Sequence, residues 1–368
     1  MATSLRVPEE ILTRLQRLSE LTGRSKTYYL IEAIQEHMDD LEKVHLVKQG
    51  LLENRAERSK RSPLEEGKRS QHSEAEVDLE VDLDLPGALA KGPQELDFVW
   101  PGFLAGTVGA LVAPGGTGKS FFALQAVIAL ACSETGGDLL ELAPPRCGKV
   151  VYLAAEDPEP ILAGRAYAIG QHLSKAARAT LAANLRIKPI LGKRVNLMDE
   201  GPLRRVIETC RGNRLIVLDT LSRLHQLDEN SNGDMAALMS VLEYMAAQTG
   251  SAVLYLHHVS KGSAREGKVD QPQAARGASA LVDNVRWCGY LASMSEAEAE
   301  HLSDQKRGRA PIGERRSSFV RFGVSKQSYG AHPPDRWYQR QEEGLLLPVE
   351  LYDVTHGNHK KGRGRDEL

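Results

Sequence analysis

The chain has 368 residues, 41% of them hydrophobic, which predicts about two domains with a sizeable core. Lys and Arg total 47 against 49 Asp and Glu, so the formal charge of -2 restricts any nucleic-acid contact to local basic patches. Four scattered cysteines without a CxxC pair argue against a disulfide framework or a structural zinc site. The longest apolar-rich stretch, residues 121–132, is too short to cross a bilayer, and no signal-peptide pattern is present, so we expect a cytoplasmic protein without a membrane partner.

The first 54 residues have the pattern of a small separate module. Residues 3–8 alternate like a short strand, and helical patterns follow over 8–21 and from 25 to about 52. This order resembles the ribbon-helix-helix domains, in which two copies pair their strands and bind the major groove of double-stranded DNA. The resemblance implies that Ser4 and Arg6 face base edges and that Arg24 and Lys26 contact a phosphate. The alternative is a helical hairpin used only for oligomerisation.

Residues 55–93 are charged and low in aromatics, which predicts a flexible linker. Within them, residues 74–85 alternate carboxylates with small or apolar side chains. Two interpretations remain open for this segment: a solvated acidic linker, or an edge strand that docks on a neighbouring subunit.

Residues 94–354 alternate short apolar runs with helical patterns, which predicts an α/β domain with helices on both faces of a mostly parallel sheet. The predicted parallel strands are 107–113, 149–155, 185–190, 215–219 and 252–257. Partly alternating strands follow at 285–292, 317–326, 336–341 and 345–351. We interpret these as an antiparallel extension of the sheet. Residues 355–368 form a basic tail that we expect to be disordered.

A phosphate-binding loop lies between the first strand and the helical pattern that follows it, which is the context that such a loop requires. Glycines let successive N–H groups converge on a phosphate at the helix N-terminus. Lys119 would contact the β- and γ-phosphates of ATP, and the Ser120 hydroxyl would bind Mg²⁺. The predicted nucleotide-binding residues are Pro114, Gly115, Gly116, Thr117, Gly118, Lys119, Ser120 and Phe121.

Three further strands end in polar residues that would face the same crevice. Asp219 is a candidate magnesium residue, Glu156 could activate the attacking water, and His258, rather than His257, could sense the γ-phosphate. Asp157, before Pro158, could alternatively be only a helix N-cap.

Several strings in this region resemble RepA-type hexameric replicative helicases of IncQ-like plasmids, whose core is RecA-like. The resemblance covers roughly residues 96–350 and is carried by YLAAEDP, HHVSKG, LVDNVRW and VRFGVSKQSYG, in addition to the phosphate loop. It implies a homohexameric ring with ATP between subunits, and a plasmid initiator and a primase as partners.

The resemblance also implies residue roles. It places an arginine finger, acting on a neighbouring subunit, at Arg286, with Lys326 as a second candidate and Arg165 as another nucleotide-site arginine. Single-stranded DNA would lie in a central channel, where loop cations follow its backbone. The candidate channel residues are Lys261, Arg265 and Lys268.

Together these features predict an ATP- and Mg²⁺-dependent DNA helicase of a plasmid or mobile element, with catalytic residues Glu156, Lys119, Asp219, His258 and Arg286. Two alternatives remain, a partition ATPase and a transcriptional repressor switched by ATP. Pro114 counts against the first, because partition ATPases carry a second lysine at that place in the loop.

Overall fold

The computed structural model describes residues 9–22, 25–27, 82–93, 95–258 and 280–354. The chain divides into two units, Met1–Ala90 and Lys91–Leu368, and each is described by itself. No helix within the described ranges is both long and apolar enough to span a membrane.

The first unit contains one long described helix, α1 (Glu9–Thr22), which confirms the helix expected over residues 8–21. The strand expected at 3–8 and almost all of the second helix lie outside the described residues, apart from helical residues at 26 and 27. Another helix, α3 (Leu85–Lys91), lies in the last part of the segment that was predicted to be a linker. The prediction missed this helix because Asp84 was interpreted as part of an acidic linker. In the structure Asp84 caps the helix, and its Oδ1 accepts a hydrogen bond from the Gly87 N–H at 3.0 Å.

The second unit is built on a nine-stranded sheet with the order β12-β11-β10-β8-β3-β7-β6-β4-β5. Its strands are β3 (Val108–Ala113), β4 (Val150–Ala154), β5 (Leu185–Pro189), β6 (Leu215–Asp219), β7 (Ala252–His258), β8 (Trp287–Ser293), β10 (Phe319–Gln327), β11 (Arg336–Arg340) and β12 (Leu346–Val349). These bounds confirm the predicted strands to within two residues at each end.

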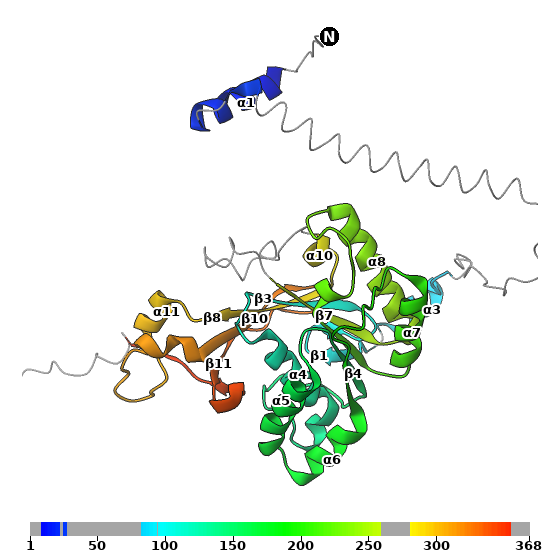
Figure 1. Cartoon of the computed structure of the whole chain (residues 1–368), viewed down its shortest axis with the longest axis vertical. Helices are drawn as coiled ribbons and strands as arrows, with labels where there is room; N and C mark the ends of the chain where they lie inside the picture. Colours follow the sequence, from blue (N-terminus) through cyan, green and yellow to red (C-terminus); the bar gives the residue numbers. More distant parts are fainter. Residues whose placement is uncertain (1–8, 23–24, 28–81, 94, 259–279, 355–368) are drawn as a thin grey trace, which may run out of the picture. The chain divides into compact units, whose positions relative to one another are not determined.

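Helices cover both faces of the sheet, as predicted (Figure 1). One face packs against α4 (Lys119–Cys132), α5 (Glu159–Gln171) and α6 (Lys175–Asn184). The other packs against α7 (Glu200–Cys210), α8 (Asn232–Thr249) and α10 (Ala280–Asp283). Successive residues of each central strand point to opposite faces, so the two hydrophobic cores share the strands β3, β4, β6 and β7.

Strand directions decide which residues meet. Strands β3, β4, β5, β6 and β7 are parallel, and β8 is parallel to β3 as well. The prediction had placed the strand at residues 285–292 in the antiparallel extension, and this was wrong, because that extension begins one strand later, where β10 pairs with β8. The strands β10, β11 and β12 are successively antiparallel.

Shorter elements complete the unit. Two small pairs of strands are formed by β1 (Phe98–Trp100) with β2 (Phe103–Leu104), and by β9 (Leu302–Ser303) with β13 (Tyr352–Asp353). The helix α11 (Glu296–His301) begins with a capping box in which Ser295 and Glu298 satisfy each other's backbone N–H.

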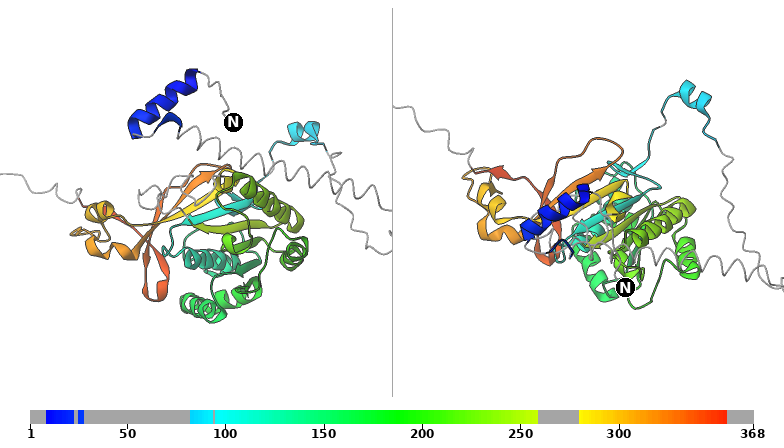
Figure 2. Two further views of the ribbon diagram at one scale, coloured as in Figure 1. Left: turned by 45° about the horizontal axis from the view of Figure 1, so that its top comes forward. Right: turned by 90° about the horizontal axis from the view of Figure 1, so that it is seen from above.

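The β11–β12 hairpin, orange to red in Figure 2, is fastened to α4 by a buried glutamine. The Gln125 side chain donates to the Leu346 carbonyl at 2.9 Å and accepts from the Leu346 N–H at 2.9 Å. Both backbone groups are thereby satisfied by a single side chain, which itself is 1% exposed.

We expect Gln125→Ala to lower the free energy of unfolding by about 2–4 kcal/mol, because two buried backbone groups lose their partners and a cavity forms. Urea denaturation measures this difference. The exposed Gln171, the last residue of α5, provides the matched control, and Gln171→Ala should change stability by less than about 0.5 kcal/mol. Equal effects of the two substitutions would contradict the assignment.

Candidate ATP-hydrolysis site

The loop between β3 and α4 has the backbone conformation of a phosphate cradle. Gly116 and Gly118 have φ values of 80° and 99°, which residues with a Cβ rarely adopt. Gly118 is the N-cap of α4, so the helix begins at Lys119. Pro114 closes the turn by accepting a hydrogen bond from the Thr117 N–H at 3.4 Å. The loop therefore ends at a helix N-terminus, where partial positive charge favours a phosphate.

Lys119 is 4% exposed, and its Nζ has no hydrogen-bond partner among the described residues. Burial lowers the pKa of this ammonium, while the nearby carboxylates of Asp219 and Glu156 oppose the shift. A buried cation without a hydrogen bond is costly unless a ligand supplies an acceptor. The loop and this orphaned donor together fit a nucleotide phosphate.

Beside the lysine, Ser120 and Asp219 form an oxygen-rich pair. The Ser120 Oγ donates to Asp219 Oδ1 at 3.1 Å, and the buried Tyr152 hydroxyl donates to Asp219 Oδ2 at 2.5 Å. Burial raises the pKa of Asp219, against the hydrogen bonds from Tyr152 and Ser120 and the charge of Lys119. Hydroxyl and carboxylate oxygens are ligands suited to Mg²⁺, which would neutralise phosphate charge there. Tyr152, which orients Asp219, had no role in the sequence prediction.

Glu156 and His258 approach each other across the end of β6. The His258 Nε2 lies 3.7 Å from Glu156 Oε1. His258 and the Lys119 ammonium lower the pKa of Glu156, with burial opposing them, so this carboxyl is a carboxylate at neutral pH. His257 is 2% exposed, whereas His258, the histidine that the sequence analysis selected, is half-buried and lies beside Glu156.

Asp157 does not cap α5, whose N-cap is Pro158 without a side-chain hydrogen bond. The alternative of an N-cap is therefore wrong. Asp157 Oδ2 instead accepts a hydrogen bond from Arg165 Nη1 at 2.6 Å, and both side chains are about one-quarter exposed. Arg165 lies almost two turns into α5, whereas Asp157 precedes the helix and directly follows Glu156 in the sequence.

The two other predicted cations lie at the opposite edge of the sheet. The Arg286 N–H donates to the carbonyl of Val108, the first residue of β3, at 3.3 Å, whereas the phosphate loop follows the last residue of that strand. Lys326 lies opposite Cys288, near the start of β8, and its Nζ donates to the carbonyls of Val282 and Asp283. The length of β3, roughly 20 Å at ~3.3 Å per residue, separates both from the loop of their own subunit.

Of the remaining predicted site residues, the structure describes Phe121 and Lys26. Phe121 is buried in the core beneath the loop, next to Gly344 of the β11–β12 hairpin. Lys26 is exposed. The other DNA-binding candidates lie outside the described residues: Ser4, Arg6, Arg24, Lys261, Arg265 and Lys268.

One arginine reaches the loop that the sequence analysis had not selected. Arg340, the last residue of β11, donates from Nη2 to the Thr117 carbonyl at 2.7 Å. The two residues are 223 positions apart, so no local motif joins them. The only signal in the sequence was spacing, because Arg340 follows the aromatic Tyr338 by two residues and a strand places both on the same face.

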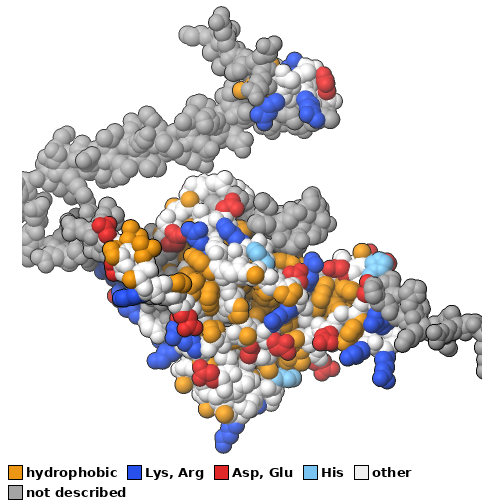
Figure 3. Space-filling view, turned by 180° about the vertical axis from the view of Figure 1, so that it is seen from behind, with side chains coloured by type: hydrophobic (Ala, Val, Ile, Leu, Met, Phe, Trp, Pro, Cys, Tyr) orange, Lys and Arg blue, Asp and Glu red, His pale blue; other side chains and the backbone are white. Residues whose placement is uncertain are grey.

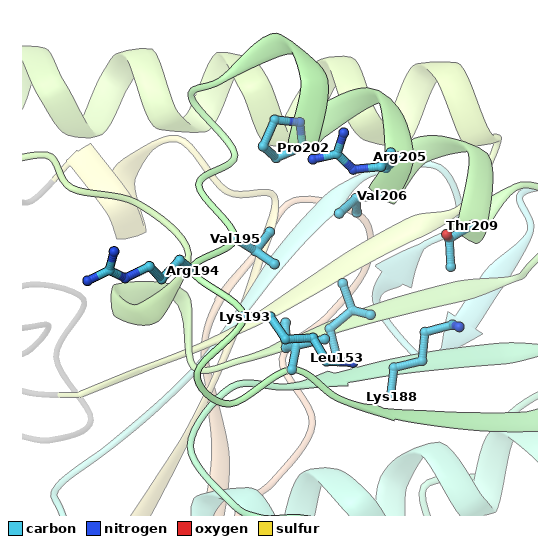
Figure 4. A pocket seen from close by; sticks show the side chains of 10 residues that line it. Leu153, Lys188, Lys193, Arg194, Val195, Pro202, Arg205, Val206 and Thr209 are labelled. Carbon is cyan, nitrogen blue, oxygen red and sulfur yellow. The ribbon is translucent and has the colours of Figure 1, made fainter.

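A separate basic pocket of about 170 Å³ lies between the edge strand β5 and α7 (Figure 4). Leu153 of β4 and Val206 of α7 contribute apolar surface to the lining, which also contains four cations: Lys188, Lys193, Arg194 and Arg205. It contains none of the phosphate-loop residues. On the face drawn in Figure 3, acidic and basic side chains of the described residues are interspersed, in keeping with the small net charge.

The fold and this site define a P-loop nucleotide hydrolase of the α/β class. Residues 75–264 match the AAA_25 family, described as an AAA domain, and the chain belongs to that family. It is an ATP hydrolase.

Three solved structures are similar to the chain at 14% sequence identity. A structure of a DnaB-like replicative helicase and its interactions with primase matches with a TM-score of 0.46 over 73% of this chain and 67% of its own. The RadB recombinase matches with a TM-score of 0.40 over 67% and 92%. The third, described as an ATPase domain, matches with a TM-score of 0.46 over 66% and 85%.

We expect Lys119→Met to abolish nucleotide binding and to raise the stability of the nucleotide-free protein by about 1 kcal/mol, because a buried charge without a hydrogen bond is removed. Thermal melting with and without Mg²⁺-ATP measures both effects. Since the folded-state pKa of Lys119 is lowered, the wild type gains stability as pH rises toward the unfolded lysine pKa, and the difference should shrink there. A less stable variant at neutral pH would contradict this account.

Proposed function

We propose that this chain is an ATP-dependent DNA helicase of a plasmid or mobile element, which translocates on single-stranded DNA as a homo-oligomeric ring of the RepA type. The observation that carries the proposal is the pairing of Glu156 with His258 at the ends of two strands, beside Lys119 and the Ser120–Asp219 pair. A carboxylate with a lowered pKa is a suitable base for orienting the attacking water. The neighbouring histidine can report the phosphate state to the residues that follow β7 in the sequence.

The position of Arg286 supports assembly in a ring. It lies at the opposite edge of the sheet from the phosphate loop of its own subunit, so any role in hydrolysis requires a second subunit. A head-to-tail contact that closes a ring brings one edge of each subunit to the other edge of the next. In that arrangement Arg286 supplies positive charge to phosphoryl transfer on its neighbour, with Lys326 as a second candidate.

The N-terminal unit adds a DNA-binding module in this proposal. Ile11 and Leu12 on α1 are 45% and 41% exposed, as expected for a helix whose apolar side chains pack in a dimer. A ribbon-helix-helix pair would then bind double-stranded DNA through Ser4 and Arg6, with Arg24 and Lys26 on the phosphate backbone. Such a module could direct the helicase to an origin or repress its own promoter.

The first test is steady-state ATP hydrolysis by the full chain with and without single-stranded DNA, comparing the wild type with Glu156→Gln. We expect single strands to stimulate the wild type and the variant to lose at least about 100-fold in kcat while still binding ATP. Native mass measured on the same samples gives the ring size. A dimer that binds nucleotide and whose ATP hydrolysis is unchanged by single-stranded DNA would overturn the helicase proposal and favour a partition ATPase or a repressor.

Mixing two inactive variants tests the trans role of Arg286. Arg286→Ala and Glu156→Gln each abolish hydrolysis in this proposal, but a mixed ring contains interfaces with an intact Glu156 facing an intact Arg286. Equal mixing should restore activity to about a quarter of the wild-type rate, since a quarter of random interfaces are complete. Arg336→Ala is the control for loss of an exposed arginine and should keep wild-type activity. Mixtures no more active than their parents would contradict the trans assignment.

A further inference from the structure

Arg340 lies at the ligand edge of the sheet although it belongs to the C-terminal extension. Because β10 is antiparallel to both β8 and β11, β11 runs in the same direction as β8 and β3. The last residue of β11 therefore lies at the same edge as the end of β3, where the phosphate loop begins. Ligands of parallel sheets bind at this edge.

The side chain of Arg340 lies on the face of β11 that packs against α4. Tyr338, two residues earlier on the same face, is buried, and its ring centroid lies 5.7 Å from the ring centroid of Phe122 on α4. Arg340 itself is partly buried, and a charged group that leaves water is stabilised when it has a hydrogen-bond partner. Here the guanidinium contacts the phosphate loop, and its Nε is buried without a hydrogen-bond partner among the described residues.

The contact with the Thr117 carbonyl fixes the peptide that joins Thr117 to Gly118. In a trans peptide the C=O and the N–H point in opposite directions. When Arg340 donates to the Thr117 carbonyl, the Gly118 N–H of the same peptide points away from Arg340. We infer that this N–H then points to the side of the loop where backbone N–H groups bind a phosphate. The guanidinium is also close to Gly118, where an added Cβ would lie 3.1 Å from Nη2.

The β11–β12 hairpin, which carries Arg340, is held against α4 by hydrogen bonds and by packing. Beyond the strand, the Gln341 N–H donates to the Leu345 carbonyl at 2.7 Å, and Leu346 is held by both polar atoms of Gln125. Gly344 packs against the Phe121 ring, and a Cβ at Gly344 would lie 3.3 Å from that ring. The loop and the C-terminal hairpin are thus connected through α4 and through Arg340.

We propose that Arg340 is a positioning residue that holds the phosphate loop in its nucleotide-binding conformation and couples the β11–β12 hairpin to nucleotide occupancy. It acts through the Thr117–Gly118 peptide and not on the reacting phosphate. The inference rests on ATP binding by the loop and is independent of whether the enzyme unwinds DNA.

The test compares Arg340→Ala, Arg340→Lys and Arg340→Met with the wild type in the full chain. Equilibrium binding of a fluorescent ADP analogue with Mg²⁺ gives Kd, and steady-state hydrolysis separates KM from kcat. We expect Arg340→Ala to raise Kd for the analogue and KM for ATP about tenfold, the loss of one charge-assisted hydrogen bond, with kcat within about twofold. Lysine keeps one donor and the charge and should recover part of the affinity.

Arg336→Ala is the matched control, since it removes an exposed arginine from the other end of β11 and should leave Kd unchanged. Arg340→Met keeps the apolar stem and replaces the alanine variant if that variant does not fold. A wild-type Kd in both Arg340→Ala and Arg340→Met would overturn the inference, as would a fall in kcat with KM unchanged. A wild type that itself fails to bind the analogue would overturn both the proposed function and this inference.

Discussion

The structure depends on keeping one buried ammonium and two carboxylates together without a direct bond between them. Lys119 has no hydrogen-bond partner among the described residues, while Asp219 is occupied by Tyr152 and Ser120 and Glu156 lies beside His258. Opposite charges in a site of low dielectric attract strongly, yet the Lys119 ammonium makes no hydrogen bond to either carboxylate. The fold tolerates this arrangement because the flanking strands and α4 are buried in two continuous hydrophobic cores. For the proposed phosphate binding, this arrangement would be the preorganised electrostatic environment that catalysis of phosphoryl transfer requires.

The parallel strands have a second consequence, because they divide the sheet into two chemically different edges. The edge where they end gathers the phosphate loop and the candidate catalytic residues, and the edge where they begin carries Arg286 and Lys326. In the proposed reaction, a single subunit would therefore lack the second set of cations near its phosphate loop, and a head-to-tail neighbour would supply them. The antiparallel extension then returns one strand, β11, to the first edge, so that the C-terminal part of the chain also reaches the loop.

The local elements were predictable where the pattern is regular. The buried strands β3, β4, β6 and β7 are short apolar runs that are followed by the phosphate loop or end at or just before charged or polar residues. The glycines before Lys119 adopt positive φ, as the glycine pattern of such a loop indicates. The errors about strand direction and helix capping occurred where a partner outside the local motif decides the outcome. The direction of β8 depends on its neighbour β3, and Asp157 is paired with Arg165 because α5 carries the arginine back over the strand end. Helix α3 was missed for a local reason, since its Asp84 cap was interpreted as part of an acidic linker.

By itself, the sequence determined the α/β class, the phosphate loop and the strand-end residues Glu156, Asp219 and His258, because each depends on chemistry within a few residues of one strand end. Only the tertiary structure decided that Tyr152 orients Asp219, that Arg286 lies far from its own loop and that Arg340 reaches Thr117. These contacts join segments separated by tens to hundreds of residues, and they follow from strand order and direction. Those properties are set by the packing of whole helices on the two faces of the sheet, which no short run of residues encodes.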